Sequence, residues 1–299
     1  MEKLLRSLEK AGIVWETDCP LSEHSSFRIG GFAALAIFPK TKEQLSEGLA
    51  ILVEREIPIT VIGKGSNVVF PDGGLSGAAV FTDRCRTMRI DGERINADAG
   101  VSLSTLANAA RDASLSGAEF AFGIPGTVGG GVFMNAGAFG GCMGDICVRS
   151  EYYDTQSGKI GFFEGDAQGF GVRTSVYENH SPRYVILGAE MQLKEGKKES
   201  ISAAMSEYWS RRRTTQPLEY PSAGSVFKRP HGYFAGKLIE DCGLKGLTVG
   251  GARVSEKHAG FIVNVGGATA EDVKRLVEKI RSEVLLQTGV ELECEIRFL

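Results

Sequence analysis

The first third of the chain alternates between continuous apolar runs and apolar residues at helical spacing. Residues 33–38 form a short apolar run, which predicts a buried strand. Residues 41–44 have the sequence of a helix-capping box and precede leucines at helical spacing, so a helix is expected there. Residues 59–62 predict a second buried strand, and a glycine turn follows at 63–67. This part therefore predicts the order strand, helix, strand.

The later pattern lacks the regular alternation of a parallel α/β fold, because the predicted strands come in groups. This grouping indicates an α+β chain. Residues 1–24 predict a helix and a connecting arm, and further helices are expected after Ser102, over 201–213 and after Thr269. Further strands are expected at 68–70, 78–81, 89–97, 152–154, 160–163, 184–193, 260–265 and 291–298.

Composition and charge narrow the class of protein. The chain has 299 residues, 42% of them hydrophobic, and a net charge of −3, so no global basic field favours nucleic acid or an anionic membrane. No apolar run reaches the length of a membrane span, and the N-terminus lacks the apolar segment of a signal peptide. The six cysteines have neither CxxC nor metal-ligand spacing. We therefore expect a cytoplasmic protein with reduced thiols, no bound metal, and neither nucleic acid nor membrane as a partner.

Glycine is the compositional outlier, and it is clustered. The sequence GKGSN at 63–67 follows a predicted strand and would offer backbone N–H groups and polar side chains to a phosphate. An ordinary turn between strands is the alternative. Residues 123–141 combine many glycines with several large apolar side chains and almost no charge. They are expected to be buried against a flat or phosphorylated ligand, with close packing of two protein elements as the alternative.

Three polar residues carry candidate chemistry. Arg173 lies among apolar residues without an acidic neighbour, so it needs an anionic partner, either a ligand or a distant glutamate. Ser225 lies in a turn or a cleft, and a hydrolase would need His231 or His258 as its base, with nothing to favour either. Glu295 shares one face of the last predicted strand with two other glutamates, which favours a solvated edge.

The motifs occur in the order of one family. The segments 25–33, 63–67, 123–141, 172–176, 216–230, 236–246, 251–264 and the final ELECEIRF resemble the UDP-N-acetylenolpyruvoylglucosamine reductases, the MurB family, along the whole chain. The uninterrupted stretch 216–264 resembles the type II members. The resemblance implies an α+β fold with a two-part FAD-binding module of the vanillyl-alcohol-oxidase (PCMH) type, followed by a smaller α+β substrate-binding domain. We expect the FAD-binding domain at 1–195, with subdomains of about 1–85 and 86–195, and the substrate-binding domain at 196–299.

The resemblance also implies a reaction. NADPH would reduce bound FAD, and the enolpyruvyl group of UDP-N-acetylenolpyruvoylglucosamine would then be reduced to give UDP-N-acetylmuramate for peptidoglycan synthesis. A monomer acting on this small-molecule substrate is expected. No histidine lies between His24 and His180, which favours non-covalent FAD over covalent attachment through that residue type.

Site residues follow from the same resemblance. Arg173 would stabilise the charge that develops on the substrate, Glu295 would hydrogen-bond the substrate carboxylate, and Ser225 would donate the final proton. The residues expected to bind substrate are Lys228, Arg229, Lys237 and Arg213. The residues expected to bind FAD are Gly63, Lys64, Gly65, Ser66, Asn67, Gly100, Gly123, Ile124, Pro125, Gly126, Thr127, Gly129, Gly130, Asn135, Ala136 and Gly137.

The chain departs from the family pattern at three places. Val172 stands where the family usually has a tyrosine before the arginine, and residues 30–34 have the sequence GGFAA, without the family's proline and aspartate. Residues 141–144, with the sequence GCMG, replace a more polar stretch of the family. These departures affect specificity and rate rather than the class of reaction. Two other functions stay open: a flavin oxidase of the same fold, and a non-catalytic UDP-sugar-binding protein with a degenerate flavin site.

Overall fold

A computed structural model describes all 299 residues. The chain forms two compact units, each described here by itself. Unit 1 comprises residues 1–18, 34–64 and 76–210, and unit 2 comprises residues 19–33, 65–75 and 211–299. The division is not a single cut near residue 195, because two N-terminal segments belong with the C-terminal part. The division into two units does not show which ligand each unit binds. The assignment of FAD to 1–195 and of substrate to 196–299 therefore stays a prediction.

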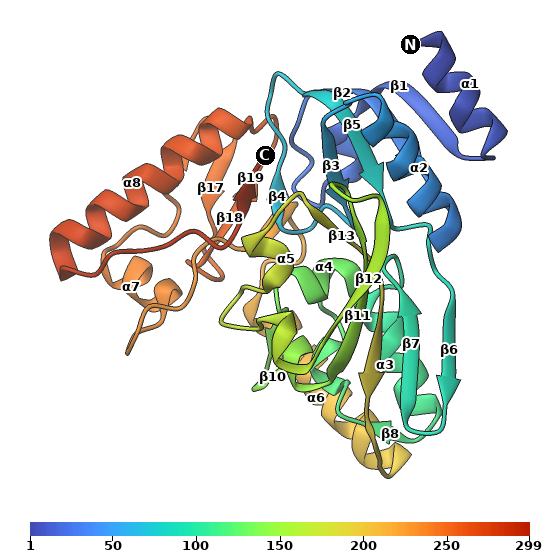
Figure 1. Cartoon of the computed structure of the whole chain (residues 1–299). Helices are drawn as coiled ribbons and strands as arrows, with labels where there is room; N and C mark the ends of the chain where they lie inside the picture. The colour runs from blue at the N-terminus through green and yellow to red at the C-terminus, as the bar shows by residue number, and fades with distance from the viewer. The chain divides into compact units, whose positions relative to one another are not determined.

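The N-terminal part of unit 1 contains a four-stranded sheet in the order β1-β2-β5-β3. Apolar residues of helices α1 and α2 share one buried cluster with residues of β2 and β5 (Figure 1). The Thr41 hydroxyl caps α2 by accepting a hydrogen bond from Gln44 N at 3.2 Å, whereas the Gln44 side chain accepts from Lys40 N instead of closing a capping box. The elements are α1 (Glu2–Lys10), β1 (Val14–Pro20), β2 (Phe32–Phe38), α2 (Lys42–Glu54), β3 (Ile59–Ile62) and β5 (Leu75–Phe81).

The second sheet of unit 1 has five antiparallel strands in the order β12-β11-β13-β7-β6. The prediction of a single strand at 89–97 was wrong. The segment is a hairpin that turns at Gly92, whose φ of +55° favours glycine. The strands predicted at 152–154 and 160–163 are confirmed within longer ones, and the strand predicted at 184–193 is confirmed except for its last residue. The strands are β6 (Met88–Asp91), β7 (Arg94–Asp98), β11 (Cys147–Asp154), β12 (Lys159–Glu164) and β13 (Tyr184–Gln192).

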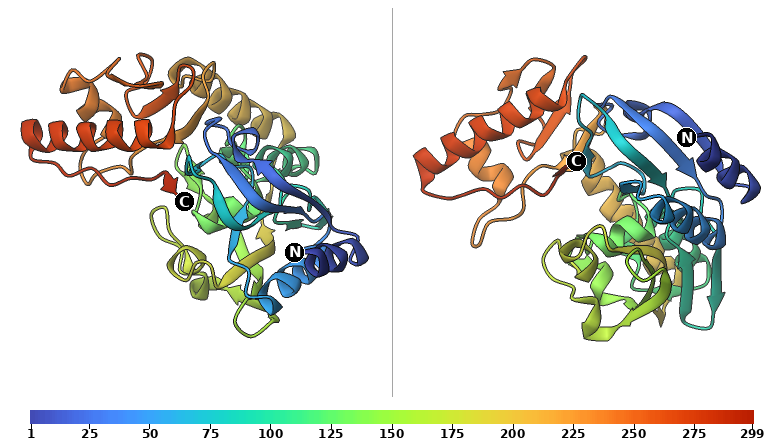
Figure 2. Two further views of the ribbon diagram at one scale, coloured as in Figure 1. Left: turned by 90° about the horizontal axis from the view of Figure 1, so that it is seen from above. Right: turned by 45° about the horizontal axis from the view of Figure 1, so that its top comes forward.

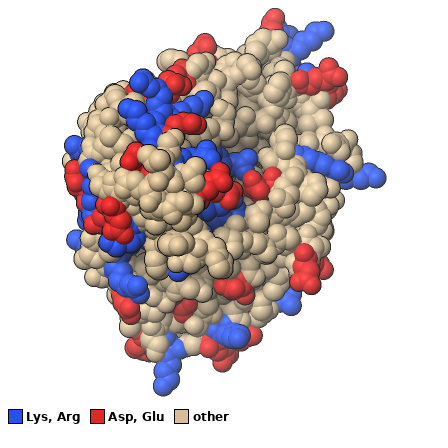
Figure 3. Space-filling view, turned by 90° about the vertical axis from the view of Figure 1, so that its left-hand side faces the viewer, with Lys and Arg blue, Asp and Glu red and all other residues tan.

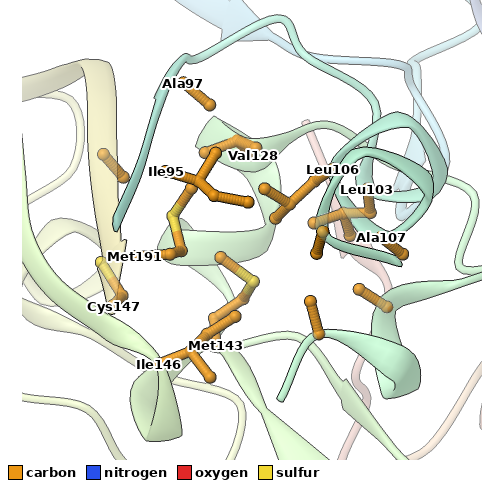
Figure 4. Packing of buried hydrophobic residues seen from close by; sticks show 14 of the residues in the cluster. Ile95, Ala97, Leu103, Leu106, Ala107, Val128, Met143, Ile146, Cys147 and Met191 are labelled. Carbon is orange, nitrogen blue, oxygen red and sulfur yellow. The ribbon is translucent and has the colours of Figure 1, made fainter. Parts of the chain in front are cut away.

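Helices α3 and α4 pack against this sheet and complete the core of unit 1. Figure 4 shows Val128 of α4 and Leu106 of α3 directed toward Ile95 and Met191 of the sheet. The predicted cap of α3 is confirmed, because the Ser102 hydroxyl accepts from Thr105 N at 3.0 Å. The helices are α3 (Leu103–Asp112), α4 (Val128–Phe133), α5 (Val176–Asn179) and α6 (Lys198–Thr215), which belongs to unit 1 as far as Ser210, with short 3-10 turns at Glu119–Ala121, Met143–Asp145 and Gly165–Gln168. Two small ribbons pair β8 (Leu115–Ser116) with β14 (Lys194–Glu195), and β9 (Gly137–Ala138) with β10 (Gly141–Cys142).

Unit 2 is built on a four-stranded antiparallel sheet in the order β15-β18-β17-β16. Helix α8 packs against this sheet (Figure 2) and has the predicted cap, with Thr269 and Asp272 forming a complete capping box. The strand expected at 291–298 is shorter than predicted: only Arg297–Phe298 forms a strand, β19, which pairs in parallel with β4. The elements are β4 (Val68–Val69), β15 (Ser222–Ser225), α7 (Ala235–Asp241), β16 (Thr248–Val249), β17 (Ala252–Val254), β18 (Phe261–Asn264), α8 (Ala270–Thr288) and β19 (Arg297–Phe298), with a 3-10 turn at Leu21–His24.

The surface carries both signs of charge. On the face drawn in Figure 3, Lys and Arg side chains are interspersed with Asp and Glu. None of the helices combines the length and hydrophobicity needed to cross a bilayer.

Candidate functional site

Three consecutive glycines of α4 lie in different environments. A Cβ at Gly129 would be 2.9 Å from the Cβ of Ala99, so packing requires glycine there, and one at Gly131 would be in tight contact, 3.1 Å, with a leucine methyl group. A Cβ at Gly130 would contact only the Thr127 hydroxyl, at an ordinary 3.6 Å, and Gly130 is exposed. Glycine within a helix is less favourable than alanine by about 1 kcal/mol. Packing within the chain therefore does not explain why residue 130 is glycine.

The backbone donors around this glycine are used within the protein. Gly129 N donates to Ala99 O at 2.8 Å, and Gly130 N donates to the Thr127 hydroxyl, which caps α4, at 3.3 Å. These two N–H groups are therefore not available as donors to a ligand.

A pocket of about 270 Å³ lies within unit 1 beside the glycine-rich run. Its lining includes the exposed residue Lys64, two serines and an aromatic pair, Phe122 and Trp209, whose ring centres are 6.1 Å apart. A ligand with both a phosphate and a flat ring suits such a lining. The pocket brings together five residues predicted for FAD with four others, and its lining is Lys64, Ser102, Ser104, Phe122, Gly123, Ile124, Pro125, Gly126 and Trp209.

Several predicted cofactor glycines serve the fold. A Cβ at Gly63 would lie 2.6 Å from the Thr127 hydroxyl, so glycine allows the end of β3 to approach the glycine-rich run. A Cβ at Gly100 would overlap the carbonyl oxygen of Thr82. Gly65 has a φ of +60°, and a Cβ there would overlap a backbone oxygen in unit 2. Close packing therefore requires glycine at these three positions, whereas an ordinary turn was the alternative to a phosphate site that the sequence offered for residues 63–67.

Arg173 lies at the tip of a tight turn in unit 1. Gly171 and Thr174 pair across this turn, and Arg173 has a φ of +57°, a left-handed conformation that is unfavourable by about 1–2 kcal/mol for a residue other than glycine. Its Nη2 donates to Gly137 O at 3.0 Å, so the guanidinium is anchored to the predicted FAD-binding run. The neighbouring predicted residue Ala136 is fixed within the run, since its N–H donates to Gly131 O at 2.8 Å.

Ser225 and Glu295 come together in unit 2. Residues 225–228 run antiparallel to 293–295, with Glu295 N donating to Val226 O at 2.8 Å and a bridge joining Phe227 to Cys294. The Ser225 hydroxyl is half-buried and donates to Phe227 O at 3.3 Å. The sequence predicted that the three glutamates of this segment are exposed to solvent. Glu291 and Glu293 are exposed, whereas Glu295 is half-buried.

Asn67, predicted for FAD, supports this arrangement within unit 2. Its Nδ2 donates to Glu295 O at 3.1 Å, and its carbonyl accepts from Arg297 N at 3.0 Å. Ser66 beside it is half-buried. The GKGSN motif is divided, with Gly63 and Lys64 in unit 1 and the other three residues in unit 2.

The predicted substrate cations are spread over unit 2. Lys228 and Lys237 form salt bridges with Glu293 and Asp241, each at 2.5 Å. Arg229 lies 4.0 Å from the centre of the Phe234 ring. The Arg213 side chain is exposed, and its carbonyl accepts from Lys257 Nζ at 2.8 Å. An anionic substrate would have to compete with the two carboxylates for both lysines.

Four pocket residues were absent from the sequence prediction: Ser102, Ser104, Phe122 and Trp209. The Ser104 hydroxyl accepts a hydrogen bond from Gly123 N at 3.1 Å, and so fixes the first residue of the glycine-rich run. Ser102 was recognised only as a helix cap, and Trp209 lies in α6, far along the sequence from the other lining residues. The spacing of hydrophobic residues along a helix shows which face is buried, but it does not show that an exposed residue such as Trp209 lines a pocket.

The cysteines and acidic residues form no further site. None of the six cysteines forms a disulfide, and burial raises the pKa of the Cys85 and Cys147 thiols to about 12. These two thiols are therefore neutral at physiological pH. No cluster of His, Cys, Asp or Glu side chains has an arrangement that would hold a metal ion.

Comparison with known proteins first defines the class. Residues 33–161 match the family model of an FAD binding domain, so the chain is an FAD-binding-domain protein with an α+β fold. Residues 216–299 match a second model, the C-terminal domain of UDP-N-acetylenolpyruvoylglucosamine reductase.

Full-length relatives then identify the family. Proteins named UDP-N-acetylenolpyruvoylglucosamine reductase from Clostridioides difficile (strain 630) and Caldicellulosiruptor bescii are each 45% identical, covering 99% and 98% of this chain and 96% and 93% of their own lengths. The solved structure of the Thermus caldophilus reductase (MurB) superposes with a TM-score of 0.80 at 34% identity, covering 96% of this chain and 98% of that one. The chain belongs to the UDP-N-acetylenolpyruvoylglucosamine reductase family, and the resemblance inferred from the motifs is confirmed.

Proposed function

We propose that this chain uses FAD and NADPH to reduce the enolpyruvyl group of UDP-N-acetylenolpyruvoylglucosamine to UDP-N-acetylmuramate, a step of peptidoglycan precursor synthesis. The observation that carries the proposal is the 45% identity over 99% of the chain to a protein of that name. The two family models, one for FAD binding and one specific to the reductase, support the same activity.

The residues of unit 1 fit a flavin dinucleotide. Gly130 is exposed where packing alone would allow alanine, and the pocket lining includes a lysine, two serines and two aromatic residues. When bound, FAD would supply the redox chemistry, taking hydride from NADPH and passing it to the enolpyruvyl carbon. We propose that FAD is held without a covalent bond, because no histidine occurs between His24 and His180 and the buried thiols of Cys85 and Cys147 are protonated.

Residues of the chain would stabilise the negative charge on the substrate and donate a proton to it. Arg173, fixed by its bond to Gly137, is a cation suited to the carboxylate on which negative charge develops. Glu295 would hydrogen-bond the same carboxylate in its protonated form. Ser225 would give a proton to the carbon next to that carboxylate. The cations Lys228, Arg229, Lys237 and Arg213 would bind the remainder of the substrate.

We also propose a monomer in the cytoplasm, where nucleotide-sugar precursors and NADPH are available. The absence of a paired or metal-ligand spacing among the cysteines supports a reducing compartment.

The decisive experiment separates two half-reactions. The purified protein should be yellow, acid precipitation should release the flavin, and NADPH should bleach it under anaerobic conditions. Adding UDP-N-acetylenolpyruvoylglucosamine should then restore the oxidised spectrum. Reoxidation by oxygen but not by this substrate would favour a flavin oxidase, and a colourless protein that cannot be reconstituted with FAD would favour a non-catalytic UDP-sugar-binding protein.

A further inference from the structure

The turn that carries Arg173 has little secondary structure to fix it. It consists of four residues closed by the pairing of Gly171 with Thr174, and one of those two bonds is long, at 3.5 Å. Arg173 itself is in the left-handed region, and Val172 beside it is 79% exposed. Such a turn needs side chains from elsewhere to hold one conformation.

Asn135 provides that support from the glycine-rich run. Its Nδ2 donates to Gly171 O at 2.8 Å, and its Oδ1 accepts from Gly144 N at 2.8 Å. The residue is only 9% exposed and has a φ of +43°, which asparagine tolerates better than most residues. The amide thus bridges two backbone segments, one of which leads directly into Arg173.

A second clamp lies on the other side of the turn. The Ser175 hydroxyl donates to Phe133 O at 2.7 Å and accepts from Tyr177 N at 3.3 Å, which caps α5. Ser175 is fully buried. The turn is therefore held at both ends, by Asn135 before Arg173 and by Ser175 after it.

We propose that Asn135 is a positioning residue, which fixes the Arg173 guanidinium for the substrate carboxylate, and is not a contact to FAD. The inference deepens the proposed function and depends on it for the role of Arg173. Both hydrogen-bonding atoms of the Asn135 amide have protein partners, which is the arrangement of a structural bridge. Loss of the bond to Gly171 would let the turn shift while the Gly137 carbonyl stayed in place.

The test compares two ligands that differ in the carboxylate. The variant Asn135→Asp keeps the size, the tolerance for positive φ and the acceptor for Gly144 N, but replaces the donor to Gly171 O with a repulsive oxygen. Calorimetry on the oxidised, FAD-loaded protein without NADPH measures binding without turnover. The affinity for UDP-N-acetylenolpyruvoylglucosamine should fall by on the order of tenfold, the loss expected when a charge-assisted hydrogen bond is displaced. The affinity for UDP-N-acetylglucosamine, which lacks the carboxylate, should be retained.

Two further variants make the result specific. In an Arg173→Met background, Asn135→Asp should have no additional effect on either ligand, because the two residues act through one contact. Asn135→Gly keeps the left-handed backbone and removes the whole side chain. It replaces Asn135→Asp in the binding measurements if the aspartate variant does not fold. Asn108→Asp, in α3, is the matched control for the change of amide to carboxylate and should bind both ligands like the wild type.

The outcomes distinguish the inference from the proposed function. Equal weakening of both ligands, no weakening of either, or failure of both Asn135 variants to fold would overturn the positioning role. An additional loss in the Arg173→Met background would also overturn it. If the wild-type protein itself fails to bind the enolpyruvyl substrate, the proposed function is refuted first, and the inference is refuted with it.

Discussion

The substitution Gly130→Ala should affect the stability of the free protein and its affinity for FAD in opposite directions. The new methyl group would contact only the Thr127 hydroxyl, at 3.6 Å, so the protein accommodates it without strain. Replacing a helical glycine should stabilise the flavin-free protein by about 0.5–1 kcal/mol. The same methyl group on the ligand-facing side would force FAD away, at a cost of about 1–3 kcal/mol, or roughly 5- to 150-fold in Kd.

The assay uses protein stripped of flavin. Urea unfolding followed by circular dichroism gives the change in stability, and titration with FAD, followed by quenching of flavin fluorescence, gives the Kd. Gly129→Ala is the matched control, because a Cβ there would lie 2.9 Å from that of Ala99 and should destabilise the free protein directly. An unchanged Kd for Gly130→Ala would refute the argument that FAD lies against this face of α4.

Three other substitutions test separate parts of the structure. Ser225→Ala should keep flavin bleaching by NADPH but lower turnover by about 10²–10⁴-fold in stopped-flow and steady-state assays, and unchanged turnover would remove Ser225 as the proton donor. The Arg183 guanidinium, which donates to Asp154 at 2.9 and 3.1 Å, holds the pKa of that carboxyl well below its usual range. This pair stabilises the fold above the unfolded pKa of about 3.9, and its contribution is lost as pH falls below that value. Arg183→Met should therefore lower the urea midpoint at pH 7. The difference between the midpoints at pH 7 and pH 3 should be smaller for this variant than for the wild type. Tyr177→Phe removes a buried bond of 2.7 Å to Ser150 and should destabilise the protein by about 1 kcal/mol in urea, and an unchanged midpoint would contradict that value.

Local sequence signals predicted the long elements well. Thr41, Ser102 and Thr269 begin helices as expected, because a cap depends on residues within one turn of each other. The apolar stripe of α8, including Val273, Leu276 and Ile280, is buried as its spacing predicted.

The errors fall where distant residues decide the structure. Strand β1 within residues 1–24 was missed, since its burial pattern is mostly exposed and it forms through pairing with other strands. Residues 291–296 alternate like a strand, yet they bond mainly to the 226–228 segment and join no sheet.

The candidate site was predicted in part. The glycine-rich run and Lys64 do line a pocket, but sequence gave no means to separate glycines needed for packing, such as Gly129, from the exposed Gly130. Nor did spacing indicate that the Asn67 amide donates to Glu295, because that contact joins residues more than two hundred positions apart.

The way the chain divides between the two units has a consequence for synthesis on the ribosome. Phe27, Ile29 and Val69 belong to the same buried cluster as α8, and β4 pairs with β19 at the extreme C-terminus. These early segments leave the ribosome long before their partners exist, so unit 2 completes its core only after the last residues have been translated. A fragment of residues 211–299 would lack part of that core, and cutting the gene before residue 211 would not yield an independent C-terminal domain.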